Sequence, residues 1–302
     1  MSDIEPSWDF YRTFLAVLQH GSLSAAAREL GLTQPTVGRH VDALEQALGS
    51  ELFTRSPQGL LPTEAALAIR PYATQLASTA ASLLRTASGT RGKVDGTVRI
   101  SASEVVGVEV LPPILATLQE QYLELGIELS LSDNVEDLLQ READIAVRMV
   151  APSQDALLAR RLGDIRLGLY AHKGYLERHG TPHTLPELAD HRLIGFDRPL
   201  PYIRAMLKKM PELKGARFAF RSDSNLAQLA AIRSGNGIGT CQTGIARRDP
   251  NLVRLLQEDF ELPMETWLAM HENLKTSPRC RVTFDALASG LANYIRQAAD
   301  HA

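Results

Sequence analysis

Apolar residues in the first fifty positions recur at steps of three and four, the spacing of one face of an α-helix. Three such runs predict three amphipathic helices, over Phe10 to Val17, Leu23 to Leu30 and Val37 to Leu48. The segment Gly31-Leu32-Thr33 joins the last two, with a glycine suited to end one helix and a threonine suited to cap the next. A three-residue turn between two helices indicates a helix-turn-helix unit.

The pattern changes after Leu48 to two short extended runs, 51–55 and 60–63, joined by the turn residues Ser56-Pro57-Gln58-Gly59. This combination predicts a two-stranded wing. An alanine-rich helix then follows, from Thr63 to about Thr90, in which apolar residues recur every seven positions. Such a seam predicts pairing with another helix. Its members are Ile69, Leu76 and Leu83.

Strands and helices alternate from about residue 97 onward. The first set predicts strands over 97–101, 127–132 and 144–149, with helices over 105–121 and 135–141. This β-α-β-α-β order is typical of a parallel sheet. A second set predicts strands over 167–171, 193–196, 217–221 and 238–241, with helices over 201–210 and 226–234. A last helix is expected over 277–301, and two α/β lobes with a cleft between them are the simplest arrangement.

These patterns divide the chain into three parts. Residues 1–65 form the winged helix-turn-helix domain, and 66–92 form a linker and dimerisation helix with a hinge. Residues 93–302 form the two-lobed domain, with lobe 1 over about 93–165 and 269–302 and lobe 2 over about 166–268.

The charge balance limits how the first part can bind nucleic acid. The chain has 32 Lys and Arg against 35 Asp and Glu, without the basic excess of many nucleic-acid binders. Residues 1–91 contain seven arginines, no lysine and eight acidic residues. Affinity for DNA must therefore come from a few well-placed groups, multiplied by oligomerisation.

Cysteine content and hydropathy predict the compartment. Two cysteines, Cys241 and Cys280, are too few for a disulfide framework or a zinc site, which favours a reducing environment. No apolar run reaches the roughly 18 residues that span a bilayer, and the first ten residues lack the features of a signal peptide. A cytoplasmic protein without a membrane segment is expected.

The N-terminal motif closely resembles that of the LysR-type transcriptional regulators. The matching runs are Phe14 to Val17, Gly21 to Leu30 and Leu32 to Val41, and the match continues through Leu44-Glu45, Leu48-Gly49, Leu52 to Arg55, Leu61, Thr63 and Glu64. The resemblance implies a winged helix-turn-helix, a linker helix and a two-lobed effector domain similar to type 2 periplasmic binding proteins. It further implies a homodimer or homotetramer that binds promoter or operator DNA under the control of a small-molecule effector.

One position departs from the family, because Gly38 stands in the recognition helix where serine is usual. Glycine lowers helix propensity by about 1 kcal/mol and removes a hydroxyl.

Recognition of DNA is expected from the start of the third helix, whose first residues would enter the major groove. Gln34 can pair with adenine, Arg39 with guanine or phosphate, and Thr36 offers a methyl and a hydroxyl. The full expected set is Ser22, Ser24, Thr33, Gln34, Pro35, Thr36, Arg39 and Arg55. The alternative is that the two serines only cap a helix and that Arg55 only solvates the wing. His40 is expected to pack or to be solvated rather than to contact bases.

An effector is expected beyond the carboxyl ends of the strands, where helix N-termini present free N–H groups. The expected residues are Ser101, Ser103, Asp133, Arg148, Ser224 and Asn225, of which the resemblance itself implies Ser101 and Ser103. Helix N-termini and an arginine favour a small carboxylate. The alternative is that Ser103, Ser224 and Asn225 are ordinary caps and that Arg148 pairs with Asp144 or Glu142.

No motif indicates catalysis, a cofactor or a metal. Gly235-Asn236-Gly237-Ile238-Gly239 leads from a helix into a strand, the reverse of the order that dinucleotide binding requires. Cys241 is expected to be a packed core residue rather than a redox sensor. A second functional hypothesis stays open: a small-molecule binding protein whose N-terminal helices serve only oligomerisation. The segment from Gln34 to Arg39 and the wing argue against it.

Overall fold

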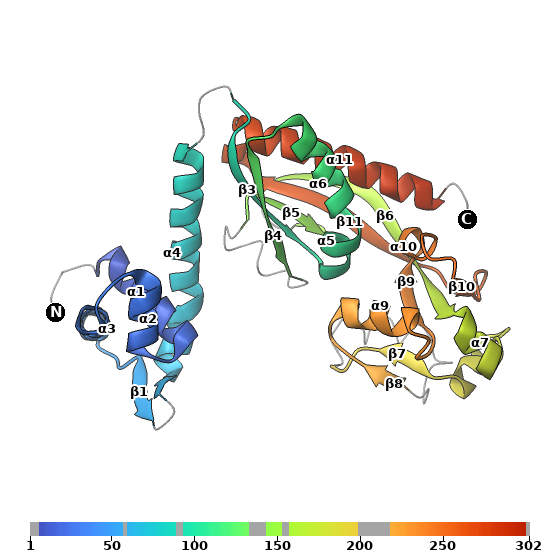
Figure 1. Ribbon diagram of the computed structural model, residues 1–302, viewed down its shortest axis with the longest axis horizontal. Coiled ribbons are helices and arrows are strands. Elements are labelled where there is room, and N and C mark those ends of the chain that lie inside the picture. The colour runs from blue at the N-terminus through green and yellow to red at the C-terminus, as the bar shows by residue number, and fades with distance from the viewer. Residues whose placement is uncertain are drawn as a thin grey trace. The chain divides into compact units, whose positions relative to one another are not determined.

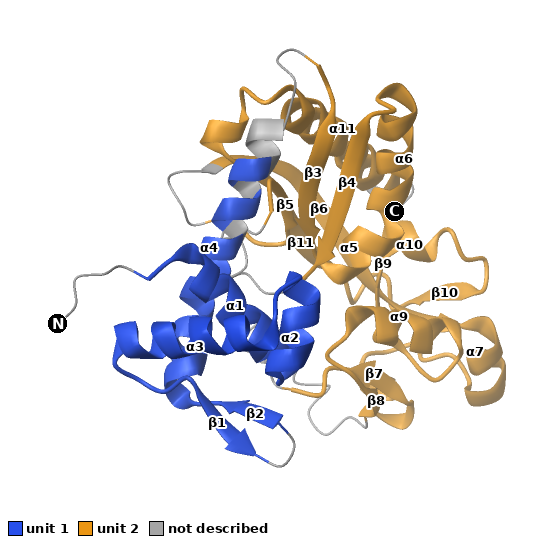
Figure 2. Cartoon of the chain, turned by 60° about the vertical axis from the view of Figure 1, so that its left-hand side comes forward, with its two compact units in different colours: residues 1–84, 139–142 blue, residues 85–138, 143–302 orange. Residues whose placement is uncertain are grey.

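The structure is a computed structural model that describes residues 6–56, 59–88, 93–132, 143–152, 157–198 and 218–299. Among these, the residues up to Leu84 form one compact unit and those from Arg85 onward form another (Figure 2). Three sequence predictions fall outside the described ranges: Asp133 and the helices over 135–141 and 201–210.

The first unit is the predicted winged helix-turn-helix with its following helix (Figure 1). It comprises α1 (Trp8–His20), α2 (Leu23–Leu30), α3 (Gln34–Leu48), β1 (Phe53–Ser56), β2 (Gly59–Pro62) and α4 (Glu64–Ser88). The turn between α2 and α3 depends on Gly31, whose φ of 66° lies in the left-handed region that side chains disfavour. The helix α4 continues through Pro71.

Two apolar clusters hold this unit together. The first joins α1, α2 and α3 through Ala16, Val17, Ala26, Ala27, Val37 and Val41. The second joins α1, α3 and the segment before β1 to the first turns of α4, through Phe14, Leu44, Leu52, Ala66 and Ala73. The beginning of α4 is therefore part of this domain's core.

A seven-stranded sheet organises the second unit. Its strands are β3 (Gly96–Ala102), β4 (Leu125–Leu131), β5 (Ile145–Arg148), β6 (Leu157–His172), β9 (Gly239–Gln242), β10 (Leu252–Leu255) and β11 (Leu262–His271). The order is β10-β6-β11-β5-β3-β4, and β9 pairs with β6. β3 runs parallel to β4 and β5, which confirms the predicted parallel start. A separate parallel pair is formed by β7 (Leu193–Gly195) and β8 (Phe218–Arg221).

The helices of this unit are α5 (Glu104–Glu109), α6 (Leu111–Gln121), α7 (Lys173–His179), α9 (Asn225–Arg233), α10 (Thr243–Ala246) and α11 (Pro278–Ala299), with short 3-10 helices at Pro186–Asp190 and Glu272–Leu274. The prediction of one helix over 105–121 was wrong. The chain divides at Val110 because Pro112 and Pro113 have no N–H to donate to the carbonyls four residues earlier.

The sequence did not predict α7, α10, β10 and β11, nor the two 3-10 helices. The strands β6 and β11 run antiparallel along ten residue pairs and form the centre of the sheet (Figure 1). The expected lobe boundaries at 165/166 and 268/269 both fall inside these two strands, so the backbone passes through them without a loop.

Candidate nucleic-acid interface and ligand site

The N-terminus of α3 is built by its cap. Thr33 Oγ1 accepts a hydrogen bond from the backbone N–H of Thr36 at 3.4 Å and shares another with Thr36 Oγ1 at 2.8 Å. Pro35 occupies the first turn, where a missing N–H is tolerated. The predicted recognition helix therefore begins at Gln34, one residue after its cap.

Side chains of the expected DNA-contacting set are joined to one another across this end. Ser24 Oγ donates to Gln34 Oε1 at 3.0 Å, and Arg39 Nη2 lies 3.5 Å from Thr36 Oγ1. We call Ser24, Thr33, Gln34, Thr36 and Arg39 the recognition patch. Thr36 is half-buried and the other four are exposed. The patch presents donors, acceptors and one cation to solvent.

Ser22 and Arg55 lie apart from this network. Ser22 stands at the N-cap position of α2, yet its side chain makes no capping hydrogen bond, and its carbonyl accepts from Ala26 N at 3.0 Å. Arg55 is exposed on β1, opposite Leu60 of β2.

The wing is fixed to the helices at two points. Leu60 N donates to the carbonyl of Gly21, between α1 and α2, at 2.8 Å. Glu45 Oε1, on α3, accepts the backbone N–H groups of Leu52 at 2.6 Å and Phe53 at 3.2 Å. These hydrogen bonds fix the position of the wing relative to the recognition helix.

Two further α3 residues face the interior of the unit. His40 Nδ1 is 2.9 Å from Thr13 Oγ1, and its ring centroid is 5.0 Å from that of Phe10, which confirms the expected packing role. A Cβ on Gly38 would have Leu23 Cδ1 as its nearest described neighbour, at 3.9 Å, which is an ordinary contact. A residue with a Cβ would therefore fit at position 38 without a steric clash.

The seam residues of α4 lie in two different environments. Ile69 packs against the second apolar cluster, within the chain. Leu76 and Leu83 are 46% and 65% exposed, and Tyr72, one turn before Leu76, is 70% exposed. Helical spacing places Tyr72, Leu76 and Leu83 on one stripe, which is apolar and has no partner among the described residues.

In the second unit, Ser101 and Arg148 meet at the carboxyl ends of β3 and β5. Arg148 Nη2 donates to Ser101 Oγ at 2.6 Å, and Nη1 donates to the carbonyl of Val147 at 3.0 Å. Both residues are buried, with 5% and 3% exposure. The guanidinium of Arg148 is therefore hydrogen-bonded to groups of the same sheet.

Ser103 and Ser224 occupy the N-cap positions of α5 and α9. Ser224 Oγ accepts from Ala227 N at 3.4 Å, so the capping alternative holds for this residue. The same hydroxyl donates to Glu104 Oε2 at 2.9 Å. A carboxylate thus reaches the start of α9, and Asn225 is the first residue of that helix.

A second contact ties α5 to α9 at their other ends. Arg233 makes a bidentate pair with Glu109, at 2.6 and 3.1 Å. The hydrogen bond from Arg233 holds the pKa of Glu109 below its ordinary value, against the effect of partial burial. Arg248 Nη1 also donates to the Glu109 carbonyl at 2.7 Å. This carbonyl has no helical donor, because Pro113, four residues later, lacks an N–H. We call the Ser224–Glu104 and Arg233–Glu109 contacts the α5–α9 clasp.

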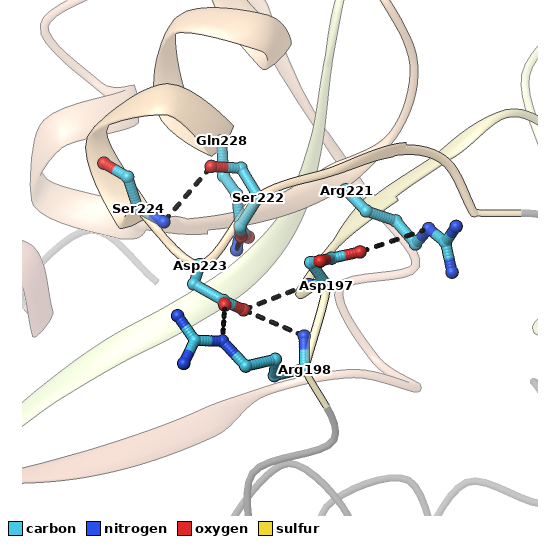
Figure 3. Close-up of polar contacts among 7 residues, drawn as sticks. All are labelled: Asp197, Arg198, Arg221, Ser222, Asp223, Ser224 and Gln228. Carbon is cyan, nitrogen blue, oxygen red and sulfur yellow. Dashed lines mark hydrogen bonds and ion pairs between the residues drawn. The ribbon is translucent and has the colours of Figure 1, made fainter. Parts of the chain in front are cut away.

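The turn before α9 is stabilised by Asp223 (Figure 3). Its Oδ1 accepts from the backbone N–H groups of Asp197 at 3.1 Å and Arg198 at 3.0 Å, and its Oδ2 accepts from Arg198 Nε at 2.6 Å. These donors, the Arg198 backbone first, hold the pKa of Asp223 below its usual range. Gln228 Nε2 donates to the Ser222 carbonyl at 2.7 Å, so the residues preceding Ser224 have defined positions.

Sequence reasoning did not identify Glu104 or Glu109, and it gave Asp223 no role of its own within the loop over 222–225. The available signal for Glu104 was an acidic residue after a predicted cap, which is also the ordinary start of a helix. Burial raises the pKa of the Cys241 thiol to about 12, as expected of a packed residue rather than a reactive thiolate. Across the described ranges, no helix is long and apolar enough to cross a membrane, and no His, Cys, Asp and Glu side chains group into a metal site.

Comparisons with protein families match two separate parts of the chain. The family model of bacterial regulatory helix-turn-helix proteins of the lysR family matches residues 8–67. The model of the LysR substrate binding domain matches residues 91–292.

Individual relatives match this chain over different shares of its length. The probable HTH-type transcriptional regulator LtrA of Klebsiella pneumoniae is 27% identical over 91% of this chain and 92% of its own length. An HTH-type transcriptional regulator of Xanthomonas campestris is 34% identical, and that match spans 60% of this chain and 53% of the relative. The solved full-length structure of the Vibrio cholerae virulence activator AphB is similar with a TM-score of 0.61 and 23% identity, over 94% of this chain and 99% of that one. Full-length CbnR, solved with its target DNA, has a TM-score of 0.65 and 20% identity, over 97% and 99%.

Proposed function

The chain belongs to the LysR family of transcriptional regulators, and from this premise we propose which of its residues bind DNA and which bind the effector. The observation that carries the proposal is the recognition patch, in which polar side chains gather at the exposed start of α3. Gln34 and Arg39 carry the amide and guanidinium groups that pair with adenine and guanine in the major groove. Ser22 and Arg55 are assigned to the phosphates on either side, and Pro35 shapes the helix start.

Pairing of two copies of the chain compensates for the low DNA affinity that one nearly neutral DNA-binding domain would have. A nearly neutral domain with a single cation in its patch gains little from counterion release, so affinity depends on two linked domains on one DNA. The exposed stripe of α4 supplies the pairing surface through Leu76 and Leu83, and Ile69 anchors that helix to the DNA-binding core. The assembly is a homodimer or a homotetramer.

The effector binds between the two lobes of the second unit, near the starts of α5 and α9. Ser103, Ser224 and Asn225 form the polar edge of this site, while Ser101 and Arg148 support it from the sheet. Asp133, which is outside the described residues, is assigned to the same site from the sequence. The carboxylate of Glu104 at this position repels an acidic ligand, which opposes the carboxylate effector that the sequence favoured. A ligand with a donor or cationic group competes for Glu104 instead.

The α5–α9 clasp offers a way for an effector to regulate DNA binding. An effector that takes Glu104 or Ser224 as its partner removes one of the two contacts that tie α5 to α9, and the population of lobe arrangements shifts. The paired DNA-binding domains then change their spacing on the promoter. We propose no catalytic reaction for the protein, and we propose that it acts in the cytoplasm, where promoter DNA is accessible.

A gel-shift titration with operator DNA tests the proposal. Arg39→Ala is expected to weaken binding by about 1–3 kcal/mol, without change in fold or oligomeric state. Arg12→Ala is the matched control, because Arg12 is equally charged and exposed on α1, outside the patch. Equal affinity of the wild type and Arg39→Ala would refute the assignment of α3 as the reading element.

A further inference from the structure

A cavity of about 210 Å³ lies in the second unit, away from the residues assigned to the effector. Its walls come from β6, α10 and β10, and from the segments that directly follow α10 and β10. The lining residues are Tyr170, Thr243, Ala246, Arg247, Leu252, Arg254 and Gln257. Tyr170 and Arg254 are direct cross-strand partners, and Leu252 is on the same face of β10 as Arg254, so the sheet presents three side chains to one space.

Two polar atoms of this lining are buried and have no hydrogen-bond partner in the described part of the chain: Thr243 Oγ1 and Arg254 Nε. Thr243 is only 2% exposed. Buried polar groups are almost always paired, so two orphans in the walls of one cavity indicate that something else supplies the acceptor.

The charge around the cavity is positive. Arg254 Nη2 donates to Glu261 at 2.9 Å, but Arg166 shares the same carboxylate at 3.2 Å, so two guanidinium groups face one negative charge. Arg247 is the second cation of the lining, after Arg254, and its Nη1 donates to the Gln297 carbonyl at 2.9 Å. An anion is therefore the ligand that the walls favour.

The backbone makes room for this arrangement. Gly168 lies beneath Arg254, and a Cβ there would come within 3.1 Å of Nε. Leu256, just before Gln257, has a φ of 50°, a conformation that non-glycine residues rarely adopt. Ala246, Leu252 and the Tyr170 ring supply apolar surface beside the polar atoms.

We propose that this cavity is a second ligand site, which binds a small organic carboxylate. The carboxylate accepts from Arg254 Nε and from the Thr243 hydroxyl, and its short apolar chain packs on Ala246 and Leu252. An arginine and a hydroxyl are suited to an anionic oxygen, while the apolar wall favours a carboxylate with a hydrocarbon tail over inorganic phosphate.

Isothermal titration of the full chain with butyrate, and separately with inorganic phosphate, tests the site. Butyrate is expected to bind more tightly than phosphate. Thr243→Val is expected to weaken butyrate binding about tenfold and to raise the melting temperature of the ligand-free protein, because it removes a buried hydroxyl that has no partner. Arg254→Gln is expected to weaken it at least as much. Arg281→Gln is the matched control, since Arg281 is an exposed arginine of the same unit, on α11, outside the lining of the cavity.

Absence of butyrate binding, binding that both cavity variants leave unchanged, or binding of phosphate at least as tight as butyrate would each overturn the proposal. Operator binding is not part of this readout, so the result is independent of the DNA-binding assignment.

Discussion

Glu45 connects the recognition helix to the wing, and its removal gives a measurable loss. Its carboxylate accepts two backbone N–H groups, from Leu52 and Phe53, and Leu52 is only 1% exposed. Glu45→Ala leaves both donors without this acceptor. A buried unsatisfied donor costs about 1–3 kcal/mol, whereas the N–H of the half-buried Phe53 regains a water partner, so a loss of about 1–3 kcal/mol in local stability is expected.

Amide hydrogen exchange of the full chain, followed by mass spectrometry, reports this loss locally. Peptides that cover residues 51–56 are expected to exchange faster in Glu45→Ala by the factor that corresponds to the lost free energy. Glu45→Gln keeps an acceptor and is expected to lose about 1 kcal/mol. Asp42→Ala, an exposed carboxylate on the same helix, is the control. Exchange in Glu45→Ala within threefold of the wild type would refute the reasoning.

Three further predictions follow from single contacts. Gly38→Ala is expected to stabilise the first unit by about 1 kcal/mol in thermal unfolding, because a Cβ meets only ordinary contact; a lower melting temperature would contradict it. Ser101→Ala removes an acceptor from the buried Arg148 and is expected to destabilise the second unit by about 1–3 kcal/mol in urea titration, whereas an unchanged midpoint would not fit. The lowered pKa of Glu109 means that its pair with Arg233 stabilises the fold above the ordinary carboxyl pKa and is lost as pH falls below about 4.5. The melting-temperature difference between wild type and Glu109→Gln is therefore expected to shrink over that range, and a constant difference would contradict it.

Local patterns predicted the first unit well. Helical periodicity, the Gly31 turn and the Thr33 cap all lie within a few residues of the elements they define, so the sequence carries their signals directly. The parallel start of the second unit was equally accessible, because β3, β4 and β5 read as separate apolar runs.

The remaining features depend on contacts between distant residues. β11 pairs with β5, more than a hundred residues earlier, and its residues change from alternating to continuous burial along its length. The Ser224–Glu104 bond spans 120 positions, so no local pattern distinguishes that glutamate from an ordinary helix start. The sequence left open whether Arg148 faces a ligand or forms an ion pair, and its hydrogen bonds to Ser101 on β3 and the Val147 carbonyl on β5 depend on packing that no local pattern reveals.

Footprinting of the promoter region beside the protein's own gene tests the central claim most directly. Paired winged helix-turn-helix domains predict two protected half-sites, one helical turn or a multiple of it apart, and loss of that protection in Arg39→Ala but not in Arg12→Ala. Protection that is absent in the wild type, or that Arg39→Ala leaves intact, would contradict the account of α3 as the DNA-reading element.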